Sequence, residues 1–192
     1  CYIKDGIERL TIAKAFEKFC HFDILSTIDN PQKPTTKLLK PIAKKLGINV
    51  SEIDTWDDIY EKLMFEFIEP NLGIDRPTIL YEYPIHQAAL SKEKDGNPNI
   101  AERFELYVCG VELANAFTEL TNRKVQEERF LHDQAEKKAI YGTTFPIDYE
   151  FLDAIENLEN CTGIALGVDR LIMLCTHAKD ITDVLWIEIP TI

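Results

Sequence analysis

The sequence predicts an α+β fold, an antiparallel sheet flanked by helices. Helical hydrophobic patterns occupy the first third of the chain, and β-rich runs bounded by turn residues begin near residue 77. Helices that precede antiparallel hairpins, with further helices interspersed, are typical of this class. At 192 residues the chain is long enough for one hydrophobic core. We therefore expect a single domain over 1–192, with a helical lobe at 1–70 and the sheet at 71–192.

Composition indicates a globular protein without a broad nucleic-acid surface. Hydrophobic residues make up 45% of the chain and charged residues 28%, and the formal net charge is −12. A negatively charged protein repels the phosphate backbone. The run KLLKPIAKK at 37–45 is a local basic exception, which is either a phosphate-binding patch or a solvated helix face.

Neither export nor membrane insertion is predicted. The sequence has no apolar run of about 18 residues, and its first ten residues, CYIKDGIERL, lack the basic and apolar parts of a signal peptide. Unpaired, scattered cysteines are typical of reduced thiols in a cytosolic protein. The five cysteines are Cys1, Cys20, Cys109, Cys161 and Cys175. We expect a cytoplasmic protein with no membrane partner.

Three helices are expected in the lobe. Residues 11–22 carry apolar side chains at helical spacing, and residues 36–46 form a short helix ended by Gly47. Thr55 can cap a third helix, which continues until Pro70. The apolar positions of this third helix are Trp56, Ile59, Tyr60, Leu63 and Phe67.

The sheet begins with the run PTILYEYP at 77–84, which is β-rich and bracketed by prolines. Residues 91–99, SKEKDGNPN, are typical of a polar loop. Two β-leaning runs within 101–120 surround Cys109 and Gly110, which predicts a hairpin.

Helices return after the hairpin. Residues 122–141 predict a long charged helix that covers the sheet and stops at Gly142, and 148–157 a short one. A strand, a turn and a helix follow across 161–178. The residues expected to face inward from the long helix are Val125, Phe130, Leu131 and Ala135.

Polar groups interrupt the second run of the hairpin, GVELANAFTELTN at 110–122. Strand alternation places Asn115, Phe117 and Glu119 on one face. If the hairpin pairs Val108 with Glu112, then Glu105 lies opposite Asn115 on that face. The same alternation puts Glu112 on the other face, so a β-bulge is needed for both acids to serve one site. The alternative is that both glutamates face water and that Phe117 is core.

A second constellation is GIALGVDRLIM at 163–173. Gly163 and Gly167 remove side chains where a strand turns into a helix, so a flat ligand can approach the backbone. Arg170 lies in the first helical turn, where a guanidinium can stack on a base and bind phosphate. Asp169 either steadies this arginine or caps the helix. The alternative is a packing turn with Asp169 and Arg170 as a surface pair.

These residues resemble a known family. The pattern G-x-A-L-G-V-D-R-L-x-M is similar to motif 3 of class II aminoacyl-tRNA synthetases, and ERFELYVCGVELANAFTEL at 102–120 is similar to the preceding strand pair of the lysyl subgroup. The resemblance covers nearly the whole chain. Ala114 and Ala165 replace glycines of lysyl-tRNA synthetases, as in the paralogous family that ligates (R)-β-lysine onto elongation factor P. Ala116 departs from both groups, which usually carry glycine there.

The resemblance implies a role for each residue of the strand. Glu119 would receive the distal amine of lysine or β-lysine, Asn115 would hold its other end, and Phe117 would pack along the methylenes. The methyl of Ala114 would narrow the floor of this pocket. His86 receives no role.

The resemblance also implies an ATP site. Glu105 and Glu112 would hold Mg²⁺ that bridges the ATP phosphates, because this ion prefers oxygen ligands. Gly163 and Gly167 would contact ATP, and Arg170 would bind it and act in catalysis.

The implied reaction is adenylation of the amino acid by ATP, followed by transfer of the acyl group to a lysine of elongation factor P. Motifs 1 and 2 of the family, including an F-R-x-E sequence, are not found in residues 1–70. Because the chain also begins at Cys1, we expect it to be the C-terminal half to two-thirds of such an enzyme, whose full length is a homodimer without tRNA as partner. The alternatives are a piece of a lysyl-tRNA synthetase and a non-catalytic remnant that binds ATP or an amino acid.

Overall fold

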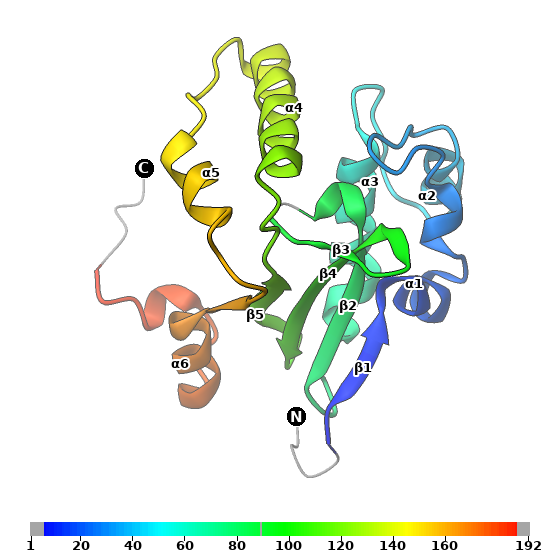
Figure 1. Ribbon diagram of the computed structural model, residues 1–192. Helices are drawn as coiled ribbons and strands as arrows, with labels where there is room; N and C mark the ends of the chain where they lie inside the picture. The colour runs from blue at the N-terminus through cyan, green and yellow to red at the C-terminus, as the bar shows by residue number, and fades with distance from the viewer. Residues whose placement is uncertain (1–5, 89, 188–192) are drawn as a thin grey trace.

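A computed structural model describes residues 6–88 and 90–187. Its centre is a six-stranded sheet in the order β1-β2-β4-β5-β6, with β3 paired to β4 (Figure 1). The strands are β1 Glu8–Thr11, β2 Thr78–Pro84, β3 Glu93–Lys94, β4 Asn97–Val108, β5 Val111–Thr118 and β6 Thr162–Leu166. The described strand pairs are antiparallel except β1 with β2, which are parallel. The predicted α+β class is confirmed, but the sheet is mixed at one edge.

Local sequence signals fix the ends of several helices. The helices are α1 Ile12–Cys20, α2 Leu39–Lys45, α3 Trp56–Leu63, α4 Arg123–Tyr141, α5 Tyr149–Ile155 and α6 Val168–Thr176. Thr55 caps α3 in a capping box, in which its hydroxyl and the Asp58 carboxylate each accept a bond from the other residue's backbone N–H. Asn122 caps α4, and Gly142 ends it with φ of 72°. These predicted boundaries are confirmed.

The hydrophobic core joins α1 and α3 to one side of the sheet. Phe16, Trp56, Leu80 and Tyr107 belong to one buried cluster, and none is more than 2% exposed. Leu80 is paired with Glu105 in the register, and we call the sheet face that carries these two residues the front face. The helical lobe covers this face (Figure 1).

A tight turn connects β4 to β5. Cys109 and Gly110 have φ of 54° and 76°, so both adopt the left-handed conformation that a two-residue type I′ hairpin requires. Their backbone N–H groups donate to Gly73 O at 2.7 Å and to Leu72 O at 2.9 Å. The turn is therefore fixed to the end of the helical lobe.

Three sequence expectations are wrong in detail. The polar loop at 91–99 contains a hairpin, because β3 turns through Asp95–Gly96 and pairs with β4. The short strand β1 was not predicted, since its pairing partner lies about 70 residues away. The inward face of α4 was also assigned wrongly.

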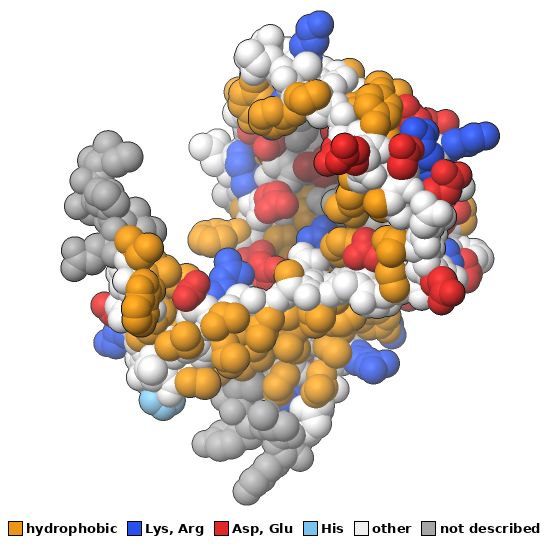
Figure 2. All heavy atoms as spheres, turned by 60° about the vertical axis from the view of Figure 1, so that its left-hand side comes forward, with side chains coloured by type: hydrophobic (Ala, Val, Ile, Leu, Met, Phe, Trp, Pro, Cys, Tyr) orange, Lys and Arg blue, Asp and Glu red, His pale blue; other side chains and the backbone are white. Residues whose placement is uncertain are grey.

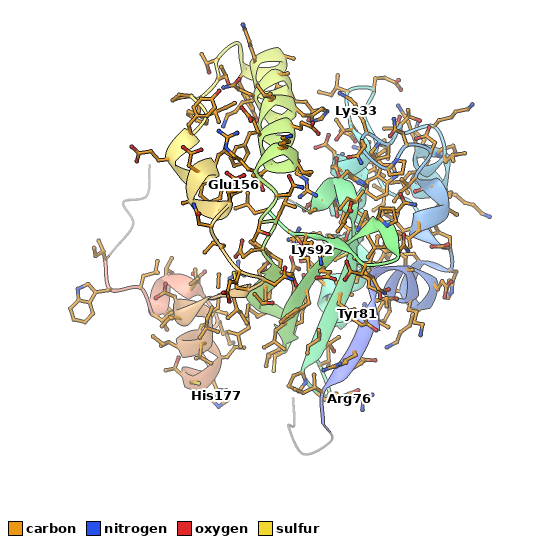
Figure 3. All side chains as sticks on the ribbon, in the orientation of Figure 1. Lys33, Arg76, Tyr81, Lys92, Glu156 and His177 are labelled. Atoms are coloured by element: carbon orange, nitrogen blue, oxygen red, sulfur yellow. The ribbon has the colours of Figure 1, made fainter. Side chains whose placement is uncertain are left out.

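The helix α4 extends away from the sheet and does not cover it (Figure 1). Its Val125 and Leu131 are 37% and 50% exposed, and only Gln126 is classed as buried. Phe130 meets Phe151 of α5 at 5.9 Å between ring centroids. Lys33, labelled in Figure 3, donates to Glu136 at 2.8 Å and links α4 to the helical lobe.

The structure also bears on the cysteines and on membrane insertion. Cys20, Cys109, Cys161 and Cys175 are free thiols, and Cys1 lies outside the described residues. Within the described ranges, no helix is both long and apolar enough to cross a membrane.

Candidate active site

A β-bulge in the hairpin brings the polar residues of β4 and β5 to one face. Val108 pairs with Val111 and Tyr107 with Glu112, but Leu106 pairs with Ala114, so Leu113 is the extra residue. Beyond the bulge Glu105 lies opposite Asn115, as expected, although the expected pairing of Val108 with Glu112 is wrong.

The bulge changes the side of the sheet to which Glu112 belongs. Glu112 is cross-strand from Tyr107, and Asn115 is cross-strand from Glu105, two residues along the same strand. Both acids and the amide therefore share the front face. Without the extra residue Leu113, Glu112 would be on the other side.

Ala114 is not part of this face. It pairs with Leu106 and Leu166 on the opposite side of the sheet, which we call the back face, and is 3% exposed. Because neighbouring residues of a strand point to opposite sides, its methyl lies across the sheet from Asn115, and the narrowing of the pocket floor by this methyl stays a prediction. Ala165, in contrast, pairs with Asn115 on the front face.

Glu105 is the centre of a buried polar network. Its Oε1 accepts from Arg103 Nη2 at 2.6 Å and from Asn115 Nδ2 at 2.9 Å, and its Oε2 accepts from the Tyr107 hydroxyl at 2.8 Å. Burial and the nearby Glu105 carboxylate raise the pKa of the Tyr107 hydroxyl, which keeps it a proton donor. Arg103 also donates to Gln87 O at 2.8 Å.

Arg170 connects α6 to the bulge. Its Nη1 donates to the backbone oxygen of Glu112 at 2.7 Å and to the Glu112 carboxylate at 3.1 Å. Arg170 thus pairs with Glu112, where the sequence left open a pair with Asp169, and the helix is not capped by Asp169 but begins after Gly167. A Cβ on Gly167 would meet Arg170 Cδ at 3.2 Å, so the glycine leaves room for the arginine stem.

Glu119 lies against β6. A Cβ on Gly163 would come within 2.7 Å of Glu119 Oε1, which is closer than such atoms approach. Gly163 pairs with Phe117, which also pairs with Arg103. The glycine therefore makes space for the Glu119 carboxylate at one end of the front face, with Phe117 between it and the Glu105 network.

A cavity of about 490 Å³ is lined by the front face and by the helical lobe. Three expected site residues line it, namely Glu105, Glu112 and Asn115. Phe117, Glu119, Gly163, Gly167 and Arg170 do not. In the space-filling view, a hollow with acidic and basic side chains opens near the centre of one side of the molecule (Figure 2).

Several lining residues were not found from the sequence. They are Asp57, Tyr60, Glu61, Met64, Glu69, Tyr83, His86, Gln87, Arg103 and Tyr107. Tyr60 was assigned to the helix core, and its ring does stack between Phe16 and Trp56 at centroid distances of 5.4 and 5.2 Å. The sequence gives no signal that its hydroxyl reaches a cavity.

The carboxylates suit a magnesium ion held mainly by a bound phosphate. In the part of the chain that the structure describes, no cluster of three or more His, Cys, Asp or Glu side chains could hold a metal alone. Mg²⁺ usually needs only one or two carboxylates together with phosphates and waters. Glu105 and Glu112 line one cavity and fit that requirement, although each already has an arginine partner.

The fold and these motifs agree with a comparison to known proteins. Residues 2–187 match the family described as tRNA synthetases class II (D, K and N). The chain belongs to this family. It is also 39% identical over 184 residues to an elongation factor P–(R)-β-lysine ligase from Proteus mirabilis (strain HI4320), covering 94% of this chain and 54% of the relative. The chain thus spans about half the length of that curated relative.

Proposed function

We propose that this chain is the ATP- and amino-acid-binding part of a ligase that activates (R)-β-lysine and transfers it to a lysine of elongation factor P. The activated form would be an aminoacyl-adenylate, and the acceptor a lysine ε-amine. The ligase name of the Proteus relative and the membership of the synthetase family support this proposal. Its acidic net charge of −12 agrees with a protein rather than tRNA as the acceptor.

The bulge at Leu113 is the observation that carries the proposal. It sets Glu112, Glu105 and Asn115 on one face, where alternation alone would separate them. A bulge beside an active site commonly re-aims a side chain that the chemistry needs. Leu113 itself is 8% exposed and lends no polar group to the front face, so the effect of the bulge on that face is the position of Glu112.

Each residue of the front face would have a distinct task. Glu105 and Glu112 would hold Mg²⁺ against the phosphates, where the ion offsets negative charge that develops during adenylation. Arg170 would leave the Glu112 carboxylate for a phosphate oxygen or the base. Glu119 would pair with the distal ammonium, Phe117 would contact the methylenes, and Asn115 would orient the carboxylate end. Positioning supplies much of the rate in such a step.

The direct test is ATP–pyrophosphate exchange with L-lysine and (R)-β-lysine in separate reactions, together with calorimetric titration of MgATP. We expect MgATP to bind, and exchange to favour (R)-β-lysine. Preference for L-lysine would assign the chain to a lysyl-tRNA synthetase instead. Binding of MgATP without exchange would indicate a remnant or an incomplete piece, and no binding of either ligand would refute the proposal.

Matched variants separate the two subsites. Arg170→Ala should weaken the binding of MgATP about tenfold or more, because a charged hydrogen bond contributes roughly 1.5–3 kcal/mol. Arg9→Ala, which removes an exposed arginine on β1, is its control. Glu119→Gln should lower the affinity for the amino acid and leave the affinity for MgATP unchanged. Its control is Glu159→Gln, at an exposed position. If a variant and its control have equal affinities for the ligand, the substituted residue does not contribute to that subsite.

A further inference from the structure

The cavity has a second wall that the proposed roles do not use. Opposite the front face, the helical lobe contributes Tyr60 and Glu61 from α3 and Glu69 from the turn Glu69–Asn71. Tyr83, on the front face of β2, and His86 of the following 3₁₀ turn adjoin these three residues in the cavity lining. We call these five residues the lobe wall.

Three groups of the lobe wall are buried without a hydrogen-bond partner. They are the hydroxyls of Tyr60 and Tyr83 and both ring nitrogens of His86. Tyr60 and Tyr83 are each 3% exposed, and the His86 side chain is 4% exposed. Buried polar groups are normally paired, since leaving water without a new partner costs free energy. Three such groups on one cavity indicate that a ligand supplies the missing bonds.

The nearest partners inside the protein do not satisfy these groups. His86 Nε2 lies 3.4 Å from Asp57 Oδ1, but that oxygen already accepts from Gln87 Nε2 at 3.0 Å. Burial first, and then the Glu105 carboxylate by its charge and as a weak hydrogen-bond partner, raise the pKa of the Tyr83 hydroxyl, but the well-formed bonds of Glu105 go to Arg103, Tyr107 and Asn115. The Tyr60 hydroxyl and the His86 ring therefore remain the clearest unpaired groups.

The charge of the cavity is strongly negative. Its lining contains five carboxylates, which belong to Asp57, Glu61, Glu69, Glu105 and Glu112, but only one arginine, Arg103. That arginine is already committed to Glu105 and to the backbone of Gln87. Partial burial, and next the negative charge of Glu105, raise the pKa of both Glu61 and Glu69. The lobe wall therefore lacks a cation.

We propose that the lobe wall binds a primary ammonium group. Such a group carries one positive charge and three N–H donors in a compact head. It can bond the Tyr60 hydroxyl, the His86 ring and the Glu61 carboxylate, all of which can accept. A magnesium ion fits these unpaired groups less well, because it prefers carboxylate, phosphate and water oxygens to a tyrosine hydroxyl and a histidine ring.

The source of the ammonium rests on the proposed function. That reaction involves two kinds of primary amine, namely the amino groups of the free amino acid and the side chain of the acceptor lysine. Both share the chemistry that the lobe wall recognises. The cavity of about 490 Å³ is large enough for either chain.

The first experiment uses n-butylammonium as the probe, without ATP, so that it is independent of the exchange assay. Its affinity for the 192-residue chain is measured by NMR titration, next to 1-butanol and tetramethylammonium. We expect n-butylammonium to bind at least about tenfold more tightly than both, because the alcohol lacks the charge and the quaternary cation lacks N–H donors. Equal binding of the three probes would overturn the proposal.

Substitutions then locate the site. Tyr60→Phe and Glu61→Gln should each weaken the binding of n-butylammonium about tenfold, since each removes one hydrogen-bond acceptor or one charge at nearly constant side-chain volume. The matched controls are Tyr81→Phe and Glu66→Gln. Tyr81, labelled on β2 in Figure 3, pairs with Phe104 on the back face, and Glu66 is exposed outside the cavity. Unchanged affinity in both cavity variants would refute the lobe wall as the site.

Thermal melts of each variant show whether it is folded, and Tyr83→Phe replaces Tyr60→Phe if the latter is not.

The two possible sources of the ammonium group, the free amino acid and the acceptor lysine, are separated by competition against n-butylammonium. Displacement by free (R)-β-lysine but not by a peptide with a single lysine assigns the wall to the amino acid, and the reverse result assigns it to the acceptor. Displacement by neither would mean that no lysine-type amine reaches the wall, which would overturn the proposal even if ATP exchange is observed.

Discussion

The two faces of the sheet differ sharply, although the same strands build both. On the front face Leu80, Glu105 and Tyr107 are all buried beneath or beside the helical lobe. On the back face, Ile164 and Leu166 of β6 are 66% and 51% exposed. The space-filling view shows a continuous area of hydrophobic side chains below the central hollow (Figure 2).

The helical lobe buries the front face, which carries both core residues such as Leu80 and the Glu105 network, whereas the back face is buried at Ala114 and Ala116 of β5 but exposed on β6. Here the helical lobe encloses a carboxylate network, whereas the aliphatic residues of β6 meet no comparable cover among the described residues. The lobe thus supplies most of the buried hydrophobic core and at the same time one wall of the cavity.

The largest effect should come from the lobe core. Phe16→Ala removes a ring that is 0% exposed and that contacts both Phe22 and Tyr60. We expect the free energy of unfolding to fall by about 3–5 kcal/mol, the usual cost of such a cavity. Urea denaturation measures it. A loss below about 1 kcal/mol would mean that the lobe is not the stable part of the molecule.

A smaller loss is expected from the front-face network. Glu105→Ala leaves Arg103 unpaired, and the two side chains are 9% and 21% exposed. Removing one partner of a fully buried pair costs about 3–5 kcal/mol, and partial exposure of Arg103 reduces our expectation to about 2–3 kcal/mol. Chemical denaturation of Glu105→Ala beside Glu105→Gln tests this. If both variants are as stable as the parent, the Glu105 network does not contribute to the free energy of unfolding.

One pH effect on stability should arise in the lobe, at Asp54. The hydrogen bonds from Lys62 and from Ser51 lower the pKa of Asp54 from 3.8 to about 2. A lowered folded-state pKa adds stability above the unfolded value, and this stability is lost as pH falls through the folded value. Stability should therefore decline between pH 3.8 and about 2 more steeply in the parent than in Asp54→Asn. Parallel pH profiles by thermal melting would contradict the assignment.

Much of the fold was predictable because local signals agree with it. The caps at Thr55 and Asn122, the stop at Gly142 and the hairpin around Cys109 all lie where the residue types place them. Each of these features depends on a few neighbouring residues. The sequence also indicated that Glu112 needs a bulge, but not that Leu113 would be the extra residue.

The parts that sequence did not predict depend on distant contacts. A second irregularity, between Tyr81 and Tyr83 with Glu82 at φ of 65°, turns Tyr83 to the front face, where Arg103 lies 4.5 Å from its ring centre. Helical spacing assigns Tyr60 to the core and does not predict that this residue also lines the cavity. The register places Ala114 on the opposite face from Asn115, and the role that the resemblance implies for its methyl stays a prediction.

The smallest effect is expected on the back face. Ile164→Thr keeps a β-branched side chain on β6, and the isoleucine is already 66% exposed, so the free energy of unfolding should change by less than about 0.5 kcal/mol. Fluorescence of an apolar dye should fall in the variant, because part of the exposed patch is removed. A loss of more than about 2 kcal/mol would instead require that Ile164 be covered in solution. Sedimentation at several protein concentrations would then show whether a second copy covers it, and the contrast between the two faces would apply only to the isolated chain.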